Sequence, residues 1–334
     1  MKNEICFGII GCSSIAERTT IPAIKEAKYA RLQMIGSRSR EKAKRFAERF
    51  SCDLFGDYDE VLERNDVDAV YISLPPSLNE KWVIRSAKAG KHILCEKPSA
   101  ISYKSAKKMV RECKKNGVRI LEGFSFRFHP QHAFVLKMMR EDILGKIFSF
   151  SGSYGFSLPY TKENFRFRKE LGGGVLNDVG CYLVYASRMI FQNKPYSISC
   201  NLDIDKKTGV DIRGTVHMTY PDRHVALAAF SYDAFFRSTY SVWGSKGFVS
   251  LKRAFNIRKN MTASINLETT AGMKCTKLRP ANQSKLMIEE FCKALQHPKT
   301  RIFNYEGDLL TQAQVMEAGR QSYLKKRITY VNEI

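Results

Sequence analysis

The sequence predicts an α/β fold in which a doubly wound parallel sheet precedes an α+β domain with an open, mostly antiparallel sheet. Five short apolar runs alternate with helical patterns over residues 1–122, the order expected of a parallel sheet covered by helices. Strand-like runs then follow one another within residues 123–334, which favours antiparallel pairing. A length of 334 residues fits these two domains, with the last helices able to pack back on the first.

The elements of the first domain are predicted from apolar runs, helical stripes and the residues that end them. Gly90 and Gly117 close the helices before them, since glycine readily adopts the conformation that follows a helix. The predicted strands cover residues 5–10, 30–37, 67–74, 91–98 and 118–124. The predicted helices cover the stretch up to residue 28 and residues 40–50, 79–90 and 102–117.

The second domain is predicted to combine a series of strands with four helices. Helices are expected near residues 130–144, 175–192, 283–296 and 306–323. An alternating stretch at 146–158 is followed by strand-like runs at about 196–204, 211–220, 224–234, 237–243 and 247–251.

The chain is strongly basic, with 55 basic and 33 acidic residues and a formal net charge of +22. The basic residues are interleaved with apolar ones at helical spacing, which is typical of solvated helix faces. The excess charge favours a field that attracts anionic small molecules. We expect no nucleic-acid binding, because no zinc-finger spacing or RNA-recognition signature is present. We expect no membrane span, because no apolar run approaches ~20 residues.

The nine cysteines show no C-x-x-C spacing, and several lie within apolar runs. This usage predicts reduced, buried thiols and a cytoplasmic location. Cys95 and Cys181 are interpreted as small buried thiols rather than nucleophiles. The six histidines form no metal-binding motif, so we expect no metal.

The stretch GIIGCSSIA, residues 8–16, lies where a dinucleotide-binding loop would follow the first strand. In the strict fingerprint, three small residues make the tight turn, admit the pyrophosphate and pack helix on strand. Gly11, Ser13 and Ala16 occupy these positions, so a serine that could donate to a phosphate replaces the middle glycine. A chance loop of small residues is the alternative. We predict dinucleotide contacts at Gly11, Cys12, Ser13, Ser14 and Ile15.

The end of the second strand indicates which dinucleotide binds. An NAD site usually places an acidic residue there to accept from the ribose 2′-hydroxyl, and no acid lies between Gln33 and Arg40. Ser37 and Arg38 stand there instead, and a guanidinium suits a 2′-phosphate. Ser39 as a helix cap beside solvated arginines is the alternative. We predict NADP(H) as the preferred cofactor, with NAD(H) possible.

Two further stretches carry candidate chemistry. CEKP places Glu96 and Lys97 at the end of the fourth strand, the edge where open α/β sheets bind ligands. GGGVLNDVGCY places Asp178 and Tyr182 on one helical face. A lysine, a carboxylate and a phenol together could transfer a proton at a carbinol oxygen. A surface Glu–Lys pair, a carboxylate favoured by the helix dipole and a half-buried tyrosine are the alternatives.

The motifs GIIGCSSIA, VYISLPPSLN, AGKHILCEKP, LEGFSFRFHPQ and LGGGVLNDVGCY, in this order, resemble the glucose-fructose oxidoreductase/inositol dehydrogenase (Gfo/Idh/MocA) family over nearly the whole chain. Tyr182 stands where inositol dehydrogenases have histidine, which resembles the branch with dimeric dihydrodiol and D-xylose dehydrogenases. The resemblance implies a Rossmann NAD(P)-binding domain, residues 1–122. It also implies a substrate-binding and oligomerisation domain, residues 123–334, whose open sheet joins homodimers or homotetramers.

The resemblance implies hydride exchange between a nicotinamide and a sugar, sugar derivative or sugar nucleotide. Lys97, Asp178 and Tyr182 fall on the family's catalytic positions, and Asn79 stands where many members have a histidine near the nicotinamide. Further cofactor contacts are predicted at Leu74, Pro75, Asn79, Glu96 and Lys97. Substrate contacts are predicted at Lys97, Arg127, Arg166, Asp178 and Tyr182. A non-catalytic nicotinamide- or sugar-sensing protein on the same fold is the alternative. His129 stays open between a residue lining the cleft and a packed structural histidine.

Overall fold

The computed structural model describes residues 4–297 and 303–334, and the chain divides into two compact units. Unit 1 contains the described residues up to Ser125 together with Gln283–Leu310. Unit 2 contains Phe126–Asn282 and Thr311–Ile334. The assignment of cofactor binding to one domain and substrate binding to the other stays a prediction.

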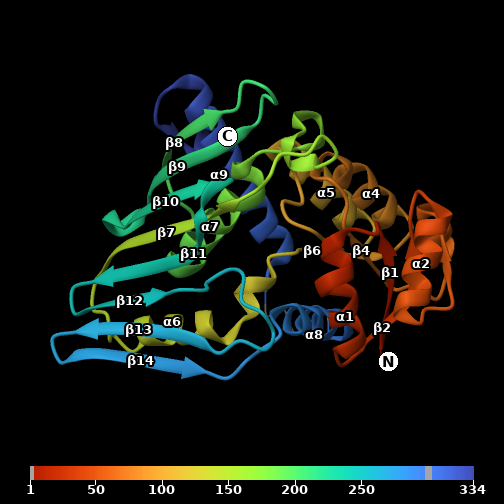
Figure 1. The fold of residues 1–334 in the computed structure, drawn as a ribbon, viewed down its shortest axis with the longest axis horizontal. Helices are drawn as coiled ribbons and strands as arrows, with labels where there is room; N and C mark the ends of the chain where they lie inside the picture. Colours follow the sequence, from red (N-terminus) through yellow and green to blue (C-terminus); the bar gives the residue numbers. More distant parts are fainter. Residues whose placement is uncertain (1–3, 298–302) are drawn as a thin grey trace. The chain divides into compact units, whose positions relative to one another are not determined.

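Unit 1 contains a six-stranded parallel sheet in the order β3-β2-β1-β4-β5-β6 (Figure 1). Its strands are β1 Ile5–Ile10, β2 Ala30–Gly36, β3 Phe55–Gly56, β4 Ala69–Ile72, β5 His92–Cys95 and β6 Ile120–Glu122. Its helices are η1 Ala16–Thr20, α1 Ile21–Glu26, α2 Arg40–Phe50, α3 Tyr58–Glu63, α4 Pro76–Lys88, α5 Tyr103–Lys115 and α8 Gln283–Gln296. The predicted doubly wound parallel sheet is confirmed, and strand order reverses between β1 and β4, where such sheets bind ligands.

The helices of unit 1 form where the sequence places apolar stripes and caps. In α2 the buried residues Ala43, Phe46, Ala47 and Phe50 form one apolar stripe, and Ser39 caps the helix by accepting from the Lys42 N–H. The short β3 and α3 were not predicted, because a two-residue strand and a six-residue helix give almost no periodic signal. α8 contacts α1, η1 and β2 although it lies far along the sequence.

Unit 2 contains a nine-stranded sheet in the order β14-β13-β12-β11-β7-β10-β9-β8-β15, and most of these strands lie one below the other in Figure 1. Only the β10–β7 pair is parallel among the described strands of this sheet. The predicted, mostly antiparallel sheet is therefore confirmed. Its strands are β7 Ile147–Ser157, β8 Ser197–Ile204, β9 Asp211–Thr219, β10 Val225–Ser231, β11 Asp233–Gly244, β12 Gly247–Leu251, β13 Ala263–Thr269, β14 Gly272–Leu278 and β15 Thr329–Tyr330.

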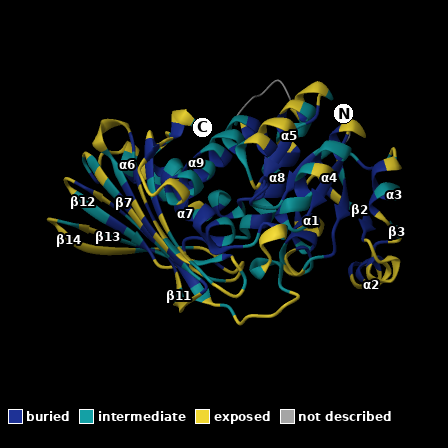
Figure 2. Ribbon diagram, turned by 90° about the horizontal axis from the view of Figure 1, so that it is seen from above, coloured by how far each residue is buried: buried dark blue, intermediate teal, exposed yellow. Residues whose placement is uncertain are grey.

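The helices of unit 2 pack on one face of this sheet. The π-helical turn η5 Leu176–Gly180 and α7 Cys181–Phe191 contact β7 and β10. The other helices of unit 2 include α6 Pro130–Arg140 and the part of α9 Tyr305–Lys325 that begins at Thr311. Buried and exposed residues alternate along the strands, as the colours in Figure 2 show. β13 and β14 were missed by the sequence analysis. β14 buries none of its residues and so lacks apolar alternation, whereas β13 buries Ala263 and Ile265 at alternate positions.

All nine cysteines are free. Seven of them are buried, Cys6 is half-buried and Cys275 is exposed, so burial was predicted too broadly for these two. Among residues 4–297 and 303–334, no helix has the length and apolar character needed to cross a membrane.

Candidate functional site

The loop after β1 makes the turn that the glycine-rich pattern predicts. Gly11 has φ +108°, and a Cβ there would lie 2.7 Å from the carbonyl oxygen of Ser73. Gly11 donates its N–H to Gly36 at 3.1 Å, and the Ser73 hydroxyl donates to the Gly11 carbonyl at 3.1 Å. The ends of β1, β2 and β4 therefore meet at a position that only glycine fills without strain.

Ser13, the unusual member of the pattern, is held inside the loop. Its hydroxyl lies 2.5 Å from the Ser73 hydroxyl and accepts from the Ala16 N–H at 3.1 Å. Cys12 is buried, and burial raises the pKa of its thiol to about 11, so the thiol is neutral at pH 7. Ser14 and Ile15 are exposed.

The residues after β2 differ in their exposure and in the partners of their side chains. Ser37 is buried and Arg38 is exposed, directly beyond the strand. Arg40 pairs with Glu60 at 2.9 Å. Burial raises the pKa of Tyr58, and the nearby Arg38 guanidinium opposes that rise. Ser39 is the helix cap that was weighed as the alternative, but this role leaves Arg38 at the strand end where the 2′-phosphate was predicted.

α4, which follows β4, brings Asn79 close to the CEKP segment after β5. The Asn79 side chain is 1% exposed and donates through Nδ2 to the Pro98 carbonyl at 3.2 Å. Its Oδ1 is buried without a hydrogen-bond partner among the described residues. Leu74 and Pro75 directly precede α4 and are half-buried. The peptide bond between Lys97 and Pro98 is cis.

Glu96 accepts a hydrogen bond from a buried tyrosine, which in turn accepts one from a buried threonine. The sequence analysis singled out neither residue. Tyr71, which is fully buried in β4, donates to Glu96 Oε1 at 2.6 Å. Thr20, at the end of η1, donates to the Tyr71 hydroxyl at 3.1 Å. Burial, and then the Glu96 carboxylate, raises the pKa of Tyr71 well above its usual range, so the phenol remains a donor. Glu96 is thereby connected to the helix that follows the glycine-rich loop.

In unit 2, Asp178 lies in the π-helical turn η5, and its carboxylate accepts two hydrogen bonds at one oxygen. Arg166 donates through Nε to Asp178 Oδ2 at 2.6 Å, and the Tyr232 hydroxyl lies 3.2 Å from the same oxygen. Arg166 was predicted as a substrate contact, and the structure gives it an intramolecular partner. Tyr232 was missed, although its place on the buried face at the end of β10 is a signal that alternation in the sequence could have given.

Three glycines, residues 172–174, precede η5. The structure gives a reason within the chain for Gly174, which has φ +110° and would place a Cβ 2.2 Å from Asp211 Oδ1. Asp211 accepts from the Leu176 N–H at 2.5 Å and so supports the start of η5. The glycine therefore allows Asp211 to reach the turn that carries Asp178.

Tyr182 packs in a cluster of aromatic rings. Its ring lies 5.3 Å from Tyr154, 5.6 Å from Phe126 and 5.8 Å from Phe255, measured between centroids. Arg127 donates to the Tyr185 hydroxyl at 2.9 Å, one turn further along α7. This surrounding fixes the Tyr182 ring from three sides while the side chain stays half-buried.

His129 has a structural role in the chain. It caps α6 by accepting from the Gln131 N–H at Nδ1, and burial lowers its pKa to about 4. Within residues 4–297 and 303–334, no group of three or more His, Cys, Asp or Glu side chains could hold a metal ion. Lys97 belongs to unit 1 and Asp178 and Tyr182 to unit 2, so their meeting in one active site stays a prediction.

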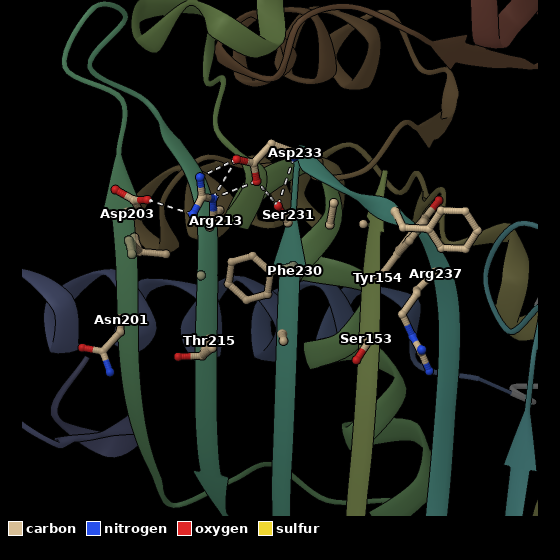
Figure 3. Close-up of a pocket in the computed structure, with 16 residues that line it drawn as sticks. Ser153, Tyr154, Asn201, Asp203, Arg213, Thr215, Phe230, Ser231, Asp233 and Arg237 are labelled. Atoms are coloured by element: carbon tan, nitrogen blue, oxygen red, sulfur yellow. Dashed lines mark hydrogen bonds and ion pairs between the residues drawn. The ribbon is translucent and has the colours of Figure 1, made fainter. Parts of the chain in front are cut away.

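A groove of about 740 Å³ crosses strands β7 to β11 of unit 2 (Figure 3). Its polar end is an ion pair between Arg213 and Asp233, to which the Ser231 hydroxyl donates at 2.6 Å. None of the predicted catalytic, cofactor or substrate residues lines it. The groove is therefore a surface separate from the predicted chemistry.

Comparison with known proteins gives matches along most of the chain. The model of the oxidoreductase family with an NAD-binding Rossmann fold, Gfo/Idh/MocA, matches residues 5–124, and the C-terminal domain model of this family matches residues 132–250. A dTDP-3,4-didehydro-2,6-dideoxy-α-D-glucose 3-reductase from Actinomadura kijaniata is 30% identical over 95% of both chains. An NADP⁺-dependent D-xylose 1-dehydrogenase from Haloferax volcanii is 29% identical over 88% of this chain and 90% of its own.

A solved structure of a 3-ketoreductase from Actinomadura kijaniata, in complex with NADP and TDP-benzene, has a TM-score of 0.91 at 30% identity. The match covers 96% of this chain and 98% of that one. The predicted function, NADP(H)-dependent oxidation or reduction of a sugar or sugar nucleotide, is thereby confirmed at the level of the family. Nothing in these relatives supports the non-catalytic alternative. With both of its domains matched, the chain belongs to the Gfo/Idh/MocA family of oxidoreductases.

Proposed function

We propose that this protein transfers hydride between NADP(H) and a hydroxyl or keto carbon of a nucleotide-linked sugar, with Lys97, Asp178 and Tyr182 as its catalytic residues. The observation that carries the proposal is the pair Ser37 and Arg38 at the end of β2, next to the Gly11 turn at the end of β1. The relatives that reduce dTDP-linked sugars support the substrate class. The net charge of +22 suits a substrate that carries a diphosphate.

The residues of unit 1 fit NADP(H). Gly11 makes the tight turn after β1, where a Cβ would meet the Ser73 carbonyl oxygen, and Cys12 to Ile15 lead from this turn into η1. Ser37 and Arg38 would hold the 2′-phosphate. Leu74, Pro75, Asn79, Glu96 and Lys97 come from the next two strand ends, and the unpaired Asn79 Oδ1 suits an amide donor such as the carboxamide of the nicotinamide. When bound, the cofactor supplies or accepts the hydride.

The catalytic residues would manage the proton that accompanies this hydride. A free tyrosine has a pKa of about 10, and a nearby ammonium favours the phenolate. We propose that Tyr182 and Lys97 exchange the proton as a coupled pair and that Asp178 orients the substrate hydroxyl or the lysine. Solved structures of the Actinomadura kijaniata 3-ketoreductase include variants with a tyrosine changed to phenylalanine and a lysine changed to alanine or glutamate. Arg127 and Arg166 complete the proposed substrate contacts.

A screen of sugar nucleotides tests the proposed substrate class. Purified protein is mixed with NADPH and a panel of nucleotide-linked keto sugars, matched free sugars and sugar phosphates, and loss of the reduced nicotinamide absorbance is followed. We expect the highest kcat/KM with a nucleotide-linked sugar. A protein that turns over free sugars as well as their nucleotide-linked forms would contradict the proposed class.

Replacing Arg38 tests the cofactor preference. We expect the natural protein to bind NADP at least about tenfold tighter than NAD, and Arg38→Ala to remove most of this difference. Arg40→Ala is the matched control, because Arg40 is also exposed but already pairs with Glu60. Calorimetric titration of each variant with both dinucleotides measures the effect. Equal or tighter binding of NAD by the natural protein would end the claim.

We further propose that the chain forms a homodimer or homotetramer through the face of the nine-stranded sheet that carries the groove. On β10 the residues Leu227 and Ala229 are exposed while Ala226, Ala228 and Phe230 are buried, so this face presents apolar side chains to its surroundings. Nearby, Phe148 and Trp243 are each more than half exposed, with their rings 5.6 Å apart. We also propose a cytoplasmic location, which the nine free cysteines support.

A charge on this face tests the assembly. We expect Leu227→Arg to convert the oligomer to monomers, because an unpaired guanidinium would be buried at the centre of the contact. Met273→Arg is the control, since Met273 is 80% exposed on the edge strand β14. Sedimentation velocity reads the mass of each variant. A natural protein that is monomeric at micromolar concentration would refute the assembly.

A further inference from the structure

We propose that Tyr232 is a positioning residue for Asp178, an inference that rests on the catalytic role proposed for Asp178 above. The Tyr232 hydroxyl lies 3.2 Å from Asp178 Oδ2 and 3.2 Å from the carbonyl oxygen of Gly174. A phenol has one hydrogen, so it is shared between these two acceptors. Since the Asp178 N–H also donates to the Gly174 carbonyl, at 3.1 Å, the phenol links the carboxylate to the turn that carries it.

The backbone of Tyr232 is fixed by both neighbouring strands. Its N–H donates to Ile212 at 2.8 Å, and its carbonyl accepts from Leu158 at 2.7 Å, directly after β10. The ring packs beside Phe156 and Phe167, with centroid distances of 6.0 Å and 5.8 Å. These contacts leave the phenol little freedom, so its hydroxyl has a fixed position beside the Asp178 carboxylate.

Arg166 completes the arrangement from another segment of the chain. Its Nε donates to Asp178 Oδ2 at 2.6 Å, the same oxygen that Tyr232 meets, and its backbone carbonyl accepts from the Gly174 N–H at 2.9 Å. Two donors on one oxygen define the direction of the carboxylate. Burial, and then the Asp178 charge, raises the pKa of Tyr232 well above its usual range, so the phenol remains a donor at neutral pH.

Tyr232 acts through Asp178 rather than on the substrate itself. The side chain is 2% exposed, whereas Asp178 and Arg166 have side chains 12% and 34% exposed. A group enclosed to this degree cannot contact a bound sugar, but it can set the angle of a carboxylate that does. Its loss should therefore lower turnover and leave the KM for NADPH unchanged.

Tyr232→Phe tests the inference, because it keeps the ring between Phe156 and Phe167 and removes only the hydroxyl. With the sugar nucleotide that reacts fastest in the screen above, we expect kcat to fall about tenfold, as for loss of a hydrogen bond to a charged group. The KM for NADPH should stay unchanged. Tyr220→Phe is the matched control, since Tyr220 is fully buried in unit 2 and its hydroxyl meets Ser187 at 2.7 Å instead. Urea unfolding of both variants measures what each hydroxyl adds to stability.

A double-mutant cycle with Asp178→Asn separates positioning from other roles. If Tyr232 acts through Asp178, adding Tyr232→Phe to Asp178→Asn lowers kcat no further. An equal fall in both backgrounds, or equal falls for Tyr232→Phe and Tyr220→Phe, would overturn the inference. Normal kcat in Tyr232→Phe beside a slow Asp178→Asn would overturn it and leave the proposed function intact. Normal kcat in Asp178→Asn would instead overturn the proposed catalytic site, and the inference with it.

Discussion

Lys97→Ala and Tyr182→Phe are each expected to lower turnover by about 10²–10⁴-fold, the range of general acid–base catalysis. Each variant removes one member of the pair proposed to move the proton, while the cofactor contacts at Gly11 and Arg38 remain. Affinity for NADP(H) should therefore be nearly unchanged. Asp178→Asn should weaken both turnover and substrate binding, because it changes the group proposed to orient the substrate.

Steady-state kinetics together with calorimetric titration of NADP measure these effects separately. Lys88→Ala, which changes an exposed lysine at the end of α4, is the control for loss of a positive charge from unit 1. Near-normal turnover in both Lys97→Ala and Tyr182→Phe, on the substrate found by the screen, would show that the proposed site is wrong.

Gly174→Ala is expected to destabilise unit 2 by about 3–5 kcal/mol and to reduce turnover strongly. The backbone at φ +110° strains any residue with a Cβ, and this Cβ would also displace Asp211 from the start of η5. The displaced turn carries Asp178, and the Gly174 carbonyl is an acceptor for Tyr232. A single methyl group thus disturbs both the fold and the proposed site.

Gly209→Ala separates backbone strain from collision in this comparison. Gly209 has φ +70° in the loop between β8 and β9, and a Cβ there would meet nothing within 4 Å. This control should therefore cost only about 1 kcal/mol and keep full turnover. Urea unfolding, monitored by circular dichroism, measures the free energy of unfolding of the two variants. Equal losses of stability in the two variants would mean that the collision of the new Cβ with Asp211 does not destabilise the protein.

Strands and helices could be predicted best where their buried side chains form an apolar run or recur at a regular spacing. Apart from β3, the parallel strands of unit 1 could be predicted because they are short, almost continuously buried apolar runs. The stripe Ala43, Phe46, Ala47 and Phe50 could be predicted because it buries apolar side chains at helical spacing. β14 could not, since an edge strand that buries none of its residues carries no such pattern. The short α3 shows its capping box at Asp57 and Glu60 only once its boundaries are known.

Residues of the candidate site could be predicted where a particular residue type is expected directly after a strand. Gly11 and Arg38 follow strand ends, and a strand end can be located from sequence. Tyr232 could not be connected with Asp178, because the two residues are far apart along the chain and meet only when β10 packs on η5. The contact between the Ser13 and Ser73 hydroxyls could not be predicted either, since Ser73 follows a different strand, and a contact of Ser13 with a phosphate stays a prediction.

The late return of the chain to unit 1 has a consequence for protein synthesis. Residues Met287, Ile288 and Phe291 of α8 are buried, and α8 covers α1 and β2, which the ribosome produces far earlier. The nascent unit 1 therefore exposes an apolar surface until nearly the whole chain has emerged, a state prone to aggregation. No single cut in the gene releases this unit intact. An isolated unit would need α8 joined by a new linker to the segment that ends at Ser125.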